Sequence, residues 1–262
     1  MALVVLASAT GAPGVTTTAL GLALLWPRHV LLADCDRDPS QAVQAGFLAG
    51  ADPSGTGLTR VVQAHRERQP IEDVLLSLTV PLAVDQDIRR VFLPGFTHPG
   101  SAALFAGAWA DLAAAFRHLD RVEMDAIVDA GRIGGSGLPT PVLAEADLVL
   151  VCVRSTLRSL AAARLHLPGL VEAVGQQAGH AEVGLVLVGE DRPYSGAEIA
   201  AQFGLPVMAV IDFDPAAAAV LSDGGERPRR FDGTGFARSL RTAATGLSSR
   251  MARTAELIRG TR

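Results

Sequence analysis

The sequence predicts an α/β protein with a doubly wound, mainly parallel sheet of about seven strands flanked by helices. Two observations lead to this fold class. Short runs rich in valine, leucine and isoleucine alternate along the chain with longer, alanine-rich runs of helical character. Several of the short runs are apolar throughout, as in Leu148 to Val153, which is typical of a strand covered by helices on both faces.

The expected elements follow one another in this alternating order. The predicted strands are residues 2–6, 30–33, 90–93, 126–128, 148–153, 183–188 and 207–211. The predicted helices are residues 19–26, 101–119 and 157–174, together with the C-terminal run. Alternation with right-handed crossovers produces parallel strands. We expect one domain over residues 1–235 and an amphipathic helix over residues 236–262 that packs on it.

The C-terminal run has apolar residues at helical spacing with arginines between them. The apolar positions recur at steps of four and seven and include Phe236, Leu240, Leu247 and Met251. A helix with this basic face can lie on an anionic membrane. Packing on the sheet, with the arginines in water, is the preferred interpretation, because Gly246 and the small alanines weaken an apolar membrane-binding face.

Composition excludes several functional classes. The chain has 262 residues and a net charge of −4, and all 23 basic residues are arginine. This mild acidity argues against non-specific nucleic-acid binding as the main activity. Cys35 and Cys152 lie in apolar runs without metal-binding spacing, so we expect buried, free thiols in a reducing cytosol. No apolar run reaches the ~18 residues of a membrane helix, and we expect a cytoplasmic protein.

The stretch from Ala7 to Thr18 joins the first predicted strand to the first predicted helix through a glycine-bearing turn. In this context backbone N–H groups at a helix N-terminus bind phosphate. The P-loop pattern G-x-x-x-x-G-K-[ST] is met only in part. Gly14 and Thr16 match it, whereas Ala9 replaces its first glycine and Val15 replaces its lysine.

Three carboxylates follow predicted strands. Asp34 and Asp36 end the second strand, and Asp129 ends the fourth. Ligands bind at the carboxyl ends of such strands, and residues at positions i and i+2 share a side, so Asp34 and Asp36 can point at a common site. The alternative is that each carboxylate caps the next helix or turn. The coincidence of three of them with the glycine turn favours a nucleotide site.

The turn resembles the deviant P-loop of the ParA/MinD ATPases, which reads roughly K-G-G-x-G-K-T-T-T. The run from Thr16 to Leu20 fits its continuation, but the two family lysines fall on Thr10 and Val15. Because its loop is degraded, the chain is most similar to the TadZ/CpaE septum-site or pilus-assembly branch. The resemblance implies ATP or ADP bound with Mg²⁺. The implied phosphate-binding residues are Gly11, Ala12, Pro13, Gly14, Val15, Thr16 and Thr17.

The resemblance also implies roles for the carboxylates. Asp36 would orient the attacking water, and Thr16, Asp34 and Asp129 would hold Mg²⁺. Gly189 stands where the family often has an asparagine that reads adenine, so backbone groups would have to read the base. Arg37 can supply a cation, although a solvated surface arginine is the preferred interpretation.

The leading hypothesis is a pseudo-ATPase that binds nucleotide weakly, hydrolyses it poorly and acts as a positioning or scaffold subunit. The resemblance implies a homodimer, a secretion or pilus-assembly ATPase or cell-division proteins as partners, and recruitment to the membrane, pole or septum. The alternative is an active Mg²⁺-dependent ATPase that uses an arginine in place of the P-loop lysine. A dinucleotide-binding oxidoreductase is disfavoured because the spacing Gly11-x-x-Gly14 is not G-x-G-x-x-G.

Overall fold

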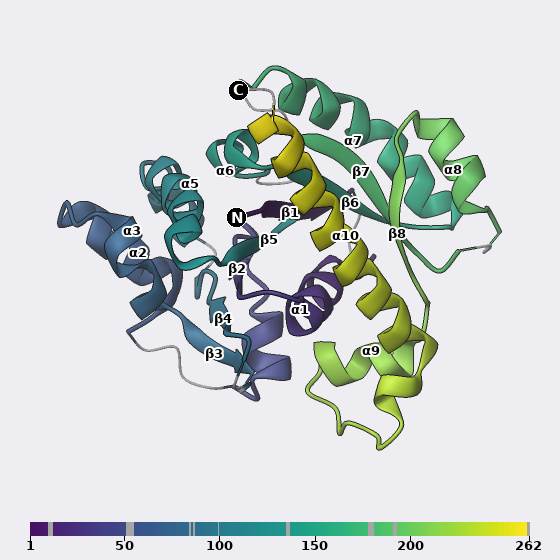
Figure 1. Ribbon diagram of the computed structural model, residues 1–262, viewed down its shortest axis with the longest axis horizontal. Coiled ribbons are helices and arrows are strands. Elements are labelled where there is room, and N and C mark those ends of the chain that lie inside the picture. The colour runs from purple at the N-terminus through teal and green to yellow at the C-terminus, as the bar shows by residue number, and fades with distance from the viewer. Residues whose placement is uncertain are drawn as a thin grey trace.

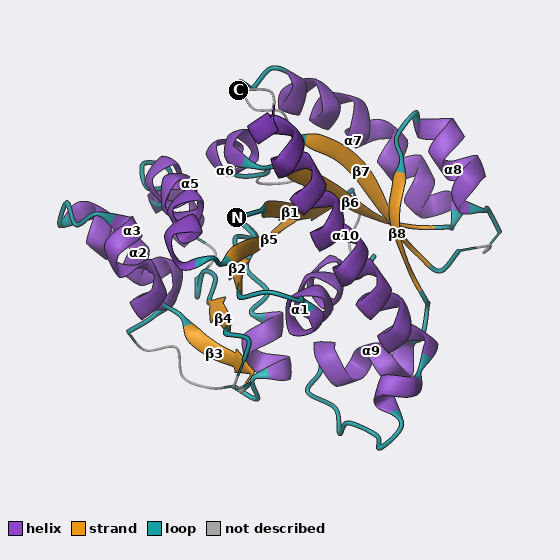
Figure 2. Ribbon diagram, in the orientation of Figure 1, coloured by secondary structure: helices purple, strands orange, loops and turns teal. Residues whose placement is uncertain are grey.

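The sheet is the framework of the molecule. The computed structural model describes residues 1–9, 13–50, 55–83, 85, 87–98, 100–134, 137–177, 181–190 and 193–260, with only the backbone of residues 255 and 257–260. Eight strands form one sheet in the order β3-β4-β2-β5-β1-β6-β7-β8. All neighbouring strands pair parallel except β3 and β4. The predicted fold class is therefore confirmed (Figures 1 and 2).

The strands correspond closely to the predicted runs. They are β1 (Leu3–Ser8), β2 (Val30–Asp34), β3 (Val80–Ala83), β4 (Arg90–Leu93), β5 (Asp125–Arg132), β6 (Leu148–Arg154), β7 (Glu182–Val188) and β8 (Val207–Ile211). The eighth strand, β3, was not predicted. It is a short antiparallel edge strand that contains Pro81 and is half-exposed, so its sequence lacks the apolar run of a central strand.

The helices cover both faces of the sheet. They are α1 (Val15–Leu25), α2 (Gly57–Arg66), α3 (Ile71–Val74), α4 (Ser101–Leu104), α5 (Trp109–His118), α6 (Thr140–Glu145), α7 (Leu157–Gly175), α8 (Gly196–Phe203), α9 (Pro215–Ser222) and α10 (Gly235–Gly260). Short 3₁₀ turns lie at Leu75–Leu78, Leu119–Val122 and Phe231–Gly233, and a π turn at Val43–Phe47. The predicted helix over residues 101–119 is divided into α4 and α5, because the chain turns at Phe105 to Ala108 to bury Phe105.

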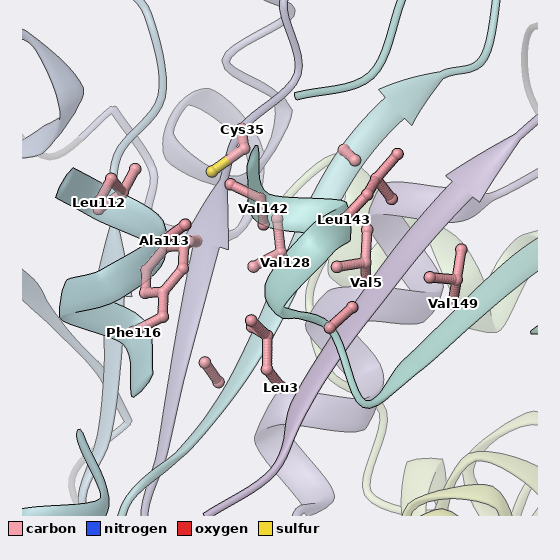
Figure 3. Packing of buried hydrophobic residues seen from close by; sticks show 14 of the residues in the cluster. Leu3, Val5, Cys35, Leu112, Ala113, Phe116, Val128, Val142, Leu143 and Val149 are labelled. Atoms are coloured by element: carbon pink, nitrogen blue, oxygen red, sulfur yellow. The ribbon is translucent and has the colours of Figure 1, made fainter. Parts of the chain in front are cut away.

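Side chains alternate between two apolar cores. On one face the strands pack against α2, α5, α6 and α7, and Figure 3 shows Leu3, Val5 and Val128 there beside residues of α5 and α6. On the other face they pack against α1, α9 and α10. Leu6 of β1 and Ile127 of β5 belong to this second core. Side chains alternate between the two faces of a strand. Residues two positions apart from Leu6 in β1, or from Ile127 in β5, therefore also project toward α1.

Helix α10 lies beside α1 and the edge strand β8 (Figure 1). Its apolar residues Phe236, Leu240, Leu247 and Met251 are buried in the second core. The contact with α1 is close at Gly21, where an added Cβ would lie 2.6 Å from Leu240 Cδ1. Arg250 on its outer side forms an ion pair with Glu182. Within the described residues, every helix is too short or too polar to span a lipid bilayer.

The cysteines are buried on opposite faces. Cys35 lies in the first core near α5 and α6 (Figure 3), and Cys152 lies in the second core. Both are buried, free thiols, which confirms that part of the expectation from the sequence.

Candidate nucleotide site

Helix α1 begins at the turn that the sequence singles out. Gly14 precedes its first residue with φ of 96°, in the left-handed region. An added Cβ would have no atom within 4 Å, so the backbone conformation rather than crowding favours glycine here. No side chain among the described residues caps the first turn of α1. Its first N–H groups are therefore available to an anion, which the helix dipole also favours.

A cleft of about 740 Å³ opens at this edge of the sheet, a size suited to small-molecule ligands. Its lining comes from both sides of the α1 N-terminus. One side is formed by the segment 13–18 with Ser8, Asp36, Asp38, Gly131 and Arg132. The other side includes Arg154, Val188, the segment 211–215 and Phe236.

The three predicted carboxylates gather on neighbouring strands: Asp34 ends β2, Asp36 follows it, and Asp129 lies within β5, which continues to Arg132 and does not end at Asp129 as predicted. Asp34 and Asp129 are register partners in β2 and β5. The backbone N–H of Asp36 donates to Asp34 Oδ1 at 3.2 Å, and Asp36 itself lines the cleft. Gly131 permits this approach, because an added Cβ would lie 2.1 Å from Asp36 Cγ. Asp34 and Asp129 lie beneath the cleft surface, at 7% and 3% exposure.

Burial and like charge disfavour ionisation of this cluster. Burial raises the pKa of Asp34 well above its ordinary value, and the nearby charge of Asp129 raises it further. Burial also raises the pKa of Asp129, against hydrogen bonds from the Thr16 side chain and the Gly131 N–H that lower it. The pKa of Asp36 is raised by burial, and the charge of Arg132 partly opposes this. An added cation would relieve the repulsion among these groups.

The shape of the whole chain matches solved structures. A ParA family ATPase from Chlorobium tepidum TLS superposes with a TM-score of 0.70 at 16% identity, over 93% of this chain and 98% of that chain. The chain has the fold of the ParA/MinD ATPases. The MinC:MinD cell division complex of Aquifex aeolicus gives a TM-score of 0.69 at 14% identity, over 95% and 96% of the two chains.

MinD of Pyrococcus horikoshii OT3, solved with Mg-ADP, has this fold as well. Its TM-score is 0.63 at 17% identity, and the match covers 93% of this chain and 94% of that chain. No protein-family model and no curated protein sequence matches the chain. The predicted resemblance is confirmed for the ParA/MinD fold, whereas the TadZ/CpaE branch stays a prediction.

In this ParA/MinD fold, most of the predicted site residues lie together. Pro13, Gly14, Val15, Thr16, Thr17 and Asp36 line the cleft. Asp129 reaches it through its hydrogen bond with Thr16, whereas Asp34 is buried against Gly95. Gly11 and Ala12, together with Thr10, lie outside the described residues.

The oxygen ligands suit Mg²⁺. The Thr16 side chain interacts with the Asp129 carboxylate and lowers its pKa, and Thr16 and Asp36 line the same cleft. Mg²⁺ in nucleotide sites takes one or two protein oxygens and completes its shell with water and phosphate. Among the described residues no three acidic, histidine or cysteine side chains form a metal site by themselves. The protein oxygens therefore fit a magnesium ion that arrives with a phosphate ligand.

Two arginines at the cleft were missed by the sequence reasoning. Arg132 ends β5 and Arg154 ends β6, and both line the cleft. Arg37, the arginine that the sequence suggested, lies beside Gly137 and is not among the lining residues. Arg154 directly follows the predicted strand 148–153, and this place at a carboxyl end is the signal that could have found it. Arg132 lies four residues beyond the predicted strand 126–128, so no such signal marks it.

Proposed function

We propose that the chain binds a nucleoside di- or triphosphate with Mg²⁺ in this cleft, hydrolyses it poorly, and acts as a positioning or scaffold subunit. The observation that carries this is that Thr16 and Asp36 line one cleft at the α1 N-terminus, where no described side chain caps the helix. Asp129 lies beneath that cleft, where the Thr16 side chain interacts with it. The Mg-ADP bound by MinD of P. horikoshii, which has the same fold, supports a nucleotide as the ligand.

Thr16 and Asp129 would hold the magnesium ion, and Asp36 lines the same cleft. The ion, when bound, would supply positive charge to the phosphate oxygens and would offset the burial and the nearby carboxylate charge that raise the pKa values of Asp36 and Asp129. The N–H groups of the first turn of α1 would bind the phosphates directly. Asp36 would orient a water molecule if hydrolysis occurs.

Weak hydrolysis follows from the residue at position 15. Val15 stands where a P-loop has lysine, and the whole chain contains no lysine. Losing one charged hydrogen bond costs about 1.5–3 kcal/mol of binding, which weakens affinity without abolishing it. Loss of a cation that stabilises the phosphoryl-transfer transition state costs on the order of 10³–10⁵ in rate. Binding without efficient turnover suits a scaffold.

The proposed partners come from proteins of the same fold. MinD of A. aeolicus forms a complex with the cell division protein MinC. By analogy we propose a cytoplasmic homodimer, related to the TadZ/CpaE branch, that cell-division proteins or a secretion or pilus-assembly ATPase recruit to the membrane, pole or septum. We also propose that residues 1–235 form the nucleotide domain and that the C-terminal segment, residues 236–262, is an amphipathic helix belonging to the same domain.

Calorimetric titration of the full chain with ATP and ADP, with and without Mg²⁺, tests the binding. We expect Mg²⁺-dependent binding that weakens strongly in Thr16→Val and is unchanged in the matched surface variant Thr254→Val. A phosphate-release assay on the same protein tests the turnover, and we expect little. Absence of binding by a folded protein to either nucleotide would contradict the proposal.

A second candidate function is an active ATPase that uses an arginine in place of the lysine. Arg132 and Arg154 favour it, because both line the cleft. It predicts steady phosphate release that falls strongly in Asp36→Ala and persists in Asp73→Ala, which alters an exposed aspartate of α3. Turnover that is insensitive to Asp36→Ala would rule out this candidate.

A further inference from the structure

Arg154 projects toward the phosphate-binding side of the sheet. It ends β6, which pairs with β1 so that Cys152 lies opposite Ser8, the last residue of β1. Cys152 belongs to the core that contains α1, and Arg154 has the same parity along β6. Adjacent strands lie ~4.8 Å apart. The Arg154 side chain is therefore one strand away from the turn that begins α1.

The charge of Arg154 has no acidic partner among the described residues. None of the ion pairs there includes it, and its Nε is fully buried without a hydrogen-bond acceptor. Its guanidinium carbon lies 4.9 Å from the centre of the Phe213 ring, which also lines the cleft. A buried donor without an acceptor costs free energy unless a ligand satisfies it.

The backbone of Arg154 is held independently of its side chain. Its N–H donates to Ser159 Oγ at 3.0 Å, at the start of α7. Stacking on Phe213 limits the directions that the guanidinium can take. The cation is thus positioned before any ligand arrives, which reduces the ordering cost of binding.

The other arginines near the cleft are placed differently. Arg132 is exposed, and its charge lowers the pKa of Asp36, so it is already opposed by a carboxylate. Arg37 does not line the cleft. The Nε of Arg37 is also fully buried without an acceptor, so the position of Arg154 in the cleft lining distinguishes the two residues. Of the described arginines that line the cleft, Arg154 is the one with a buried Nε that lacks an acceptor.

We propose that Arg154 is the cation that binds the phosphate chain of the nucleotide, from the strand opposite the loop rather than from within it. A guanidinium can donate two parallel hydrogen bonds to phosphate oxygens, which a lysine cannot. This assignment rests on the proposed nucleotide site. It explains how the site retains a cation although Val15 replaces the loop lysine.

Titration of the full chain with Mg-ADP tests the assignment in Arg154→Gln and Arg154→Lys. We expect Arg154→Gln to weaken binding about 10- to 100-fold, the usual effect of one charged hydrogen bond. Arg154→Lys should recover part of that loss, because it keeps the charge. Arg158→Gln, which removes an exposed arginine in the first turn of α7, is the matched control and should bind as the parent does.

The salt dependence separates a phosphate contact from stacking on the base. If Arg154 binds phosphate, the affinity of the parent falls more steeply with sodium chloride than that of Arg154→Gln. Equal slopes, or equal affinities of the parent and Arg154→Gln, would overturn the assignment and leave the nucleotide site intact. A parent protein that binds neither ADP nor ATP would remove the proposed function together with this inference. If Arg154→Gln does not fold, the loss in Arg154→Lys relative to Arg158→Lys decides.

Discussion

The two ends of strand β5 each carry a buried aspartate, and the surroundings of these residues are opposite. Asp125 at the start of the strand is 1% exposed and accepts hydrogen bonds from the Ala2 N–H at 2.8 Å and Trp26 Nε1 at 2.9 Å. The Arg28 guanidinium lies 3.6 Å away. Asp129 near the end is 3% exposed and lies beside Asp34 and Asp36.

The difference separates a structural carboxylate from a functional candidate. Both residues are buried aspartates of the same strand, so neither burial nor residue type identifies the functional site. What differs is the sign of the neighbouring charge: a guanidinium faces Asp125, whereas the charged groups near Asp129 are the carboxylates of Asp34 and Asp36. A cluster of acids whose pKa values are raised, first by burial and then by one another's charge, is typical of a functional site and would be relieved by a bound cation.

The largest expected effect is the loss of stability in Asp125→Asn. Each carboxylate oxygen of Asp125 accepts one N–H, so the amide of asparagine would place its NH₂ against a donor. We expect the free energy of unfolding to fall by about 2–4 kcal/mol. Urea unfolding of the nucleotide-free protein measures it. A loss below ~0.5 kcal/mol would show that the two ends of β5 do not differ as described.

The same substitution at the other end, Asp129→Asn, should have the opposite sign near neutral pH. The pKa of Asp129 is higher in the folded protein than its ordinary value. The contribution of Asp129 to the free energy of unfolding is therefore fully present below the ordinary pKa, and it is lost as the pH rises through the pKa of the folded state. Asparagine does not ionise and can still accept a hydrogen bond. We expect it to stabilise the nucleotide-free protein by about 1–3 kcal/mol at pH 8 and by little at pH 4.

Unfolding of the parent and Asp129→Asn at several pH values measures that difference. A gain that is equal at pH 4 and pH 8 would mean that ionisation of Asp129 is not its cause. The variant should also lose Mg²⁺-dependent nucleotide binding, whereas Asp125→Asn should keep it at temperatures where it is folded. Asp125→Asn would then lower stability and keep nucleotide binding, whereas Asp129→Asn would raise stability and lose nucleotide binding.

Most of the fold could be predicted from the sequence because strands buried on both faces are apolar throughout. Seven of the eight strands are of this kind or nearly so. The edge strand β3 was missed because half-exposed residues and Pro81 leave no such pattern. The break between α4 and α5 was missed because it depends on burying Phe105 against Phe96 and Trp109, contacts that local spacing does not reveal.

The sequence predicts those candidate site residues that lie at the glycine turn or near the end of a predicted strand. Thr16 lies in the first turn of α1, Asp36 follows β2 and Asp129 lies within β5. The structure places Thr16 and Asp36 in the lining of one cleft and Asp129 beneath it. Arg154 was not found, because its importance depends on the strand face it occupies and on its contact with Phe213, a residue distant in sequence. The sequence suggested Arg37 because it is next to Asp36, but Arg37 does not line the cleft.

Thr16→Val tests the hydroxyl that links the cleft to Asp129. Its removal takes away a hydrogen bond that lowers the pKa of Asp129, so the carboxyl pKa should rise further. We expect a loss of about 1 kcal/mol in the free energy of unfolding, and Thr16→Ser should restore it because serine keeps the donor. Unfolding of the three proteins at pH 7 provides the measurement. If serine behaves as valine does, packing of the methyl group and not the hydroxyl would be responsible.

The smallest expected effect belongs to Arg28→Gln, at the structural end of β5. Arg28 faces Asp125, but its side chain is 44% exposed and the two atoms are 3.6 Å apart, so water and salt screen the attraction. We expect a loss below ~0.5 kcal/mol, which 0.5 M sodium chloride should abolish. Urea unfolding at two salt concentrations measures it. A loss near that of Asp125→Asn would mean that the guanidinium, rather than the N–H groups of Ala2 and Trp26, stabilises the buried carboxylate. The contrast between the two ends of β5 would then depend on ion pairing alone.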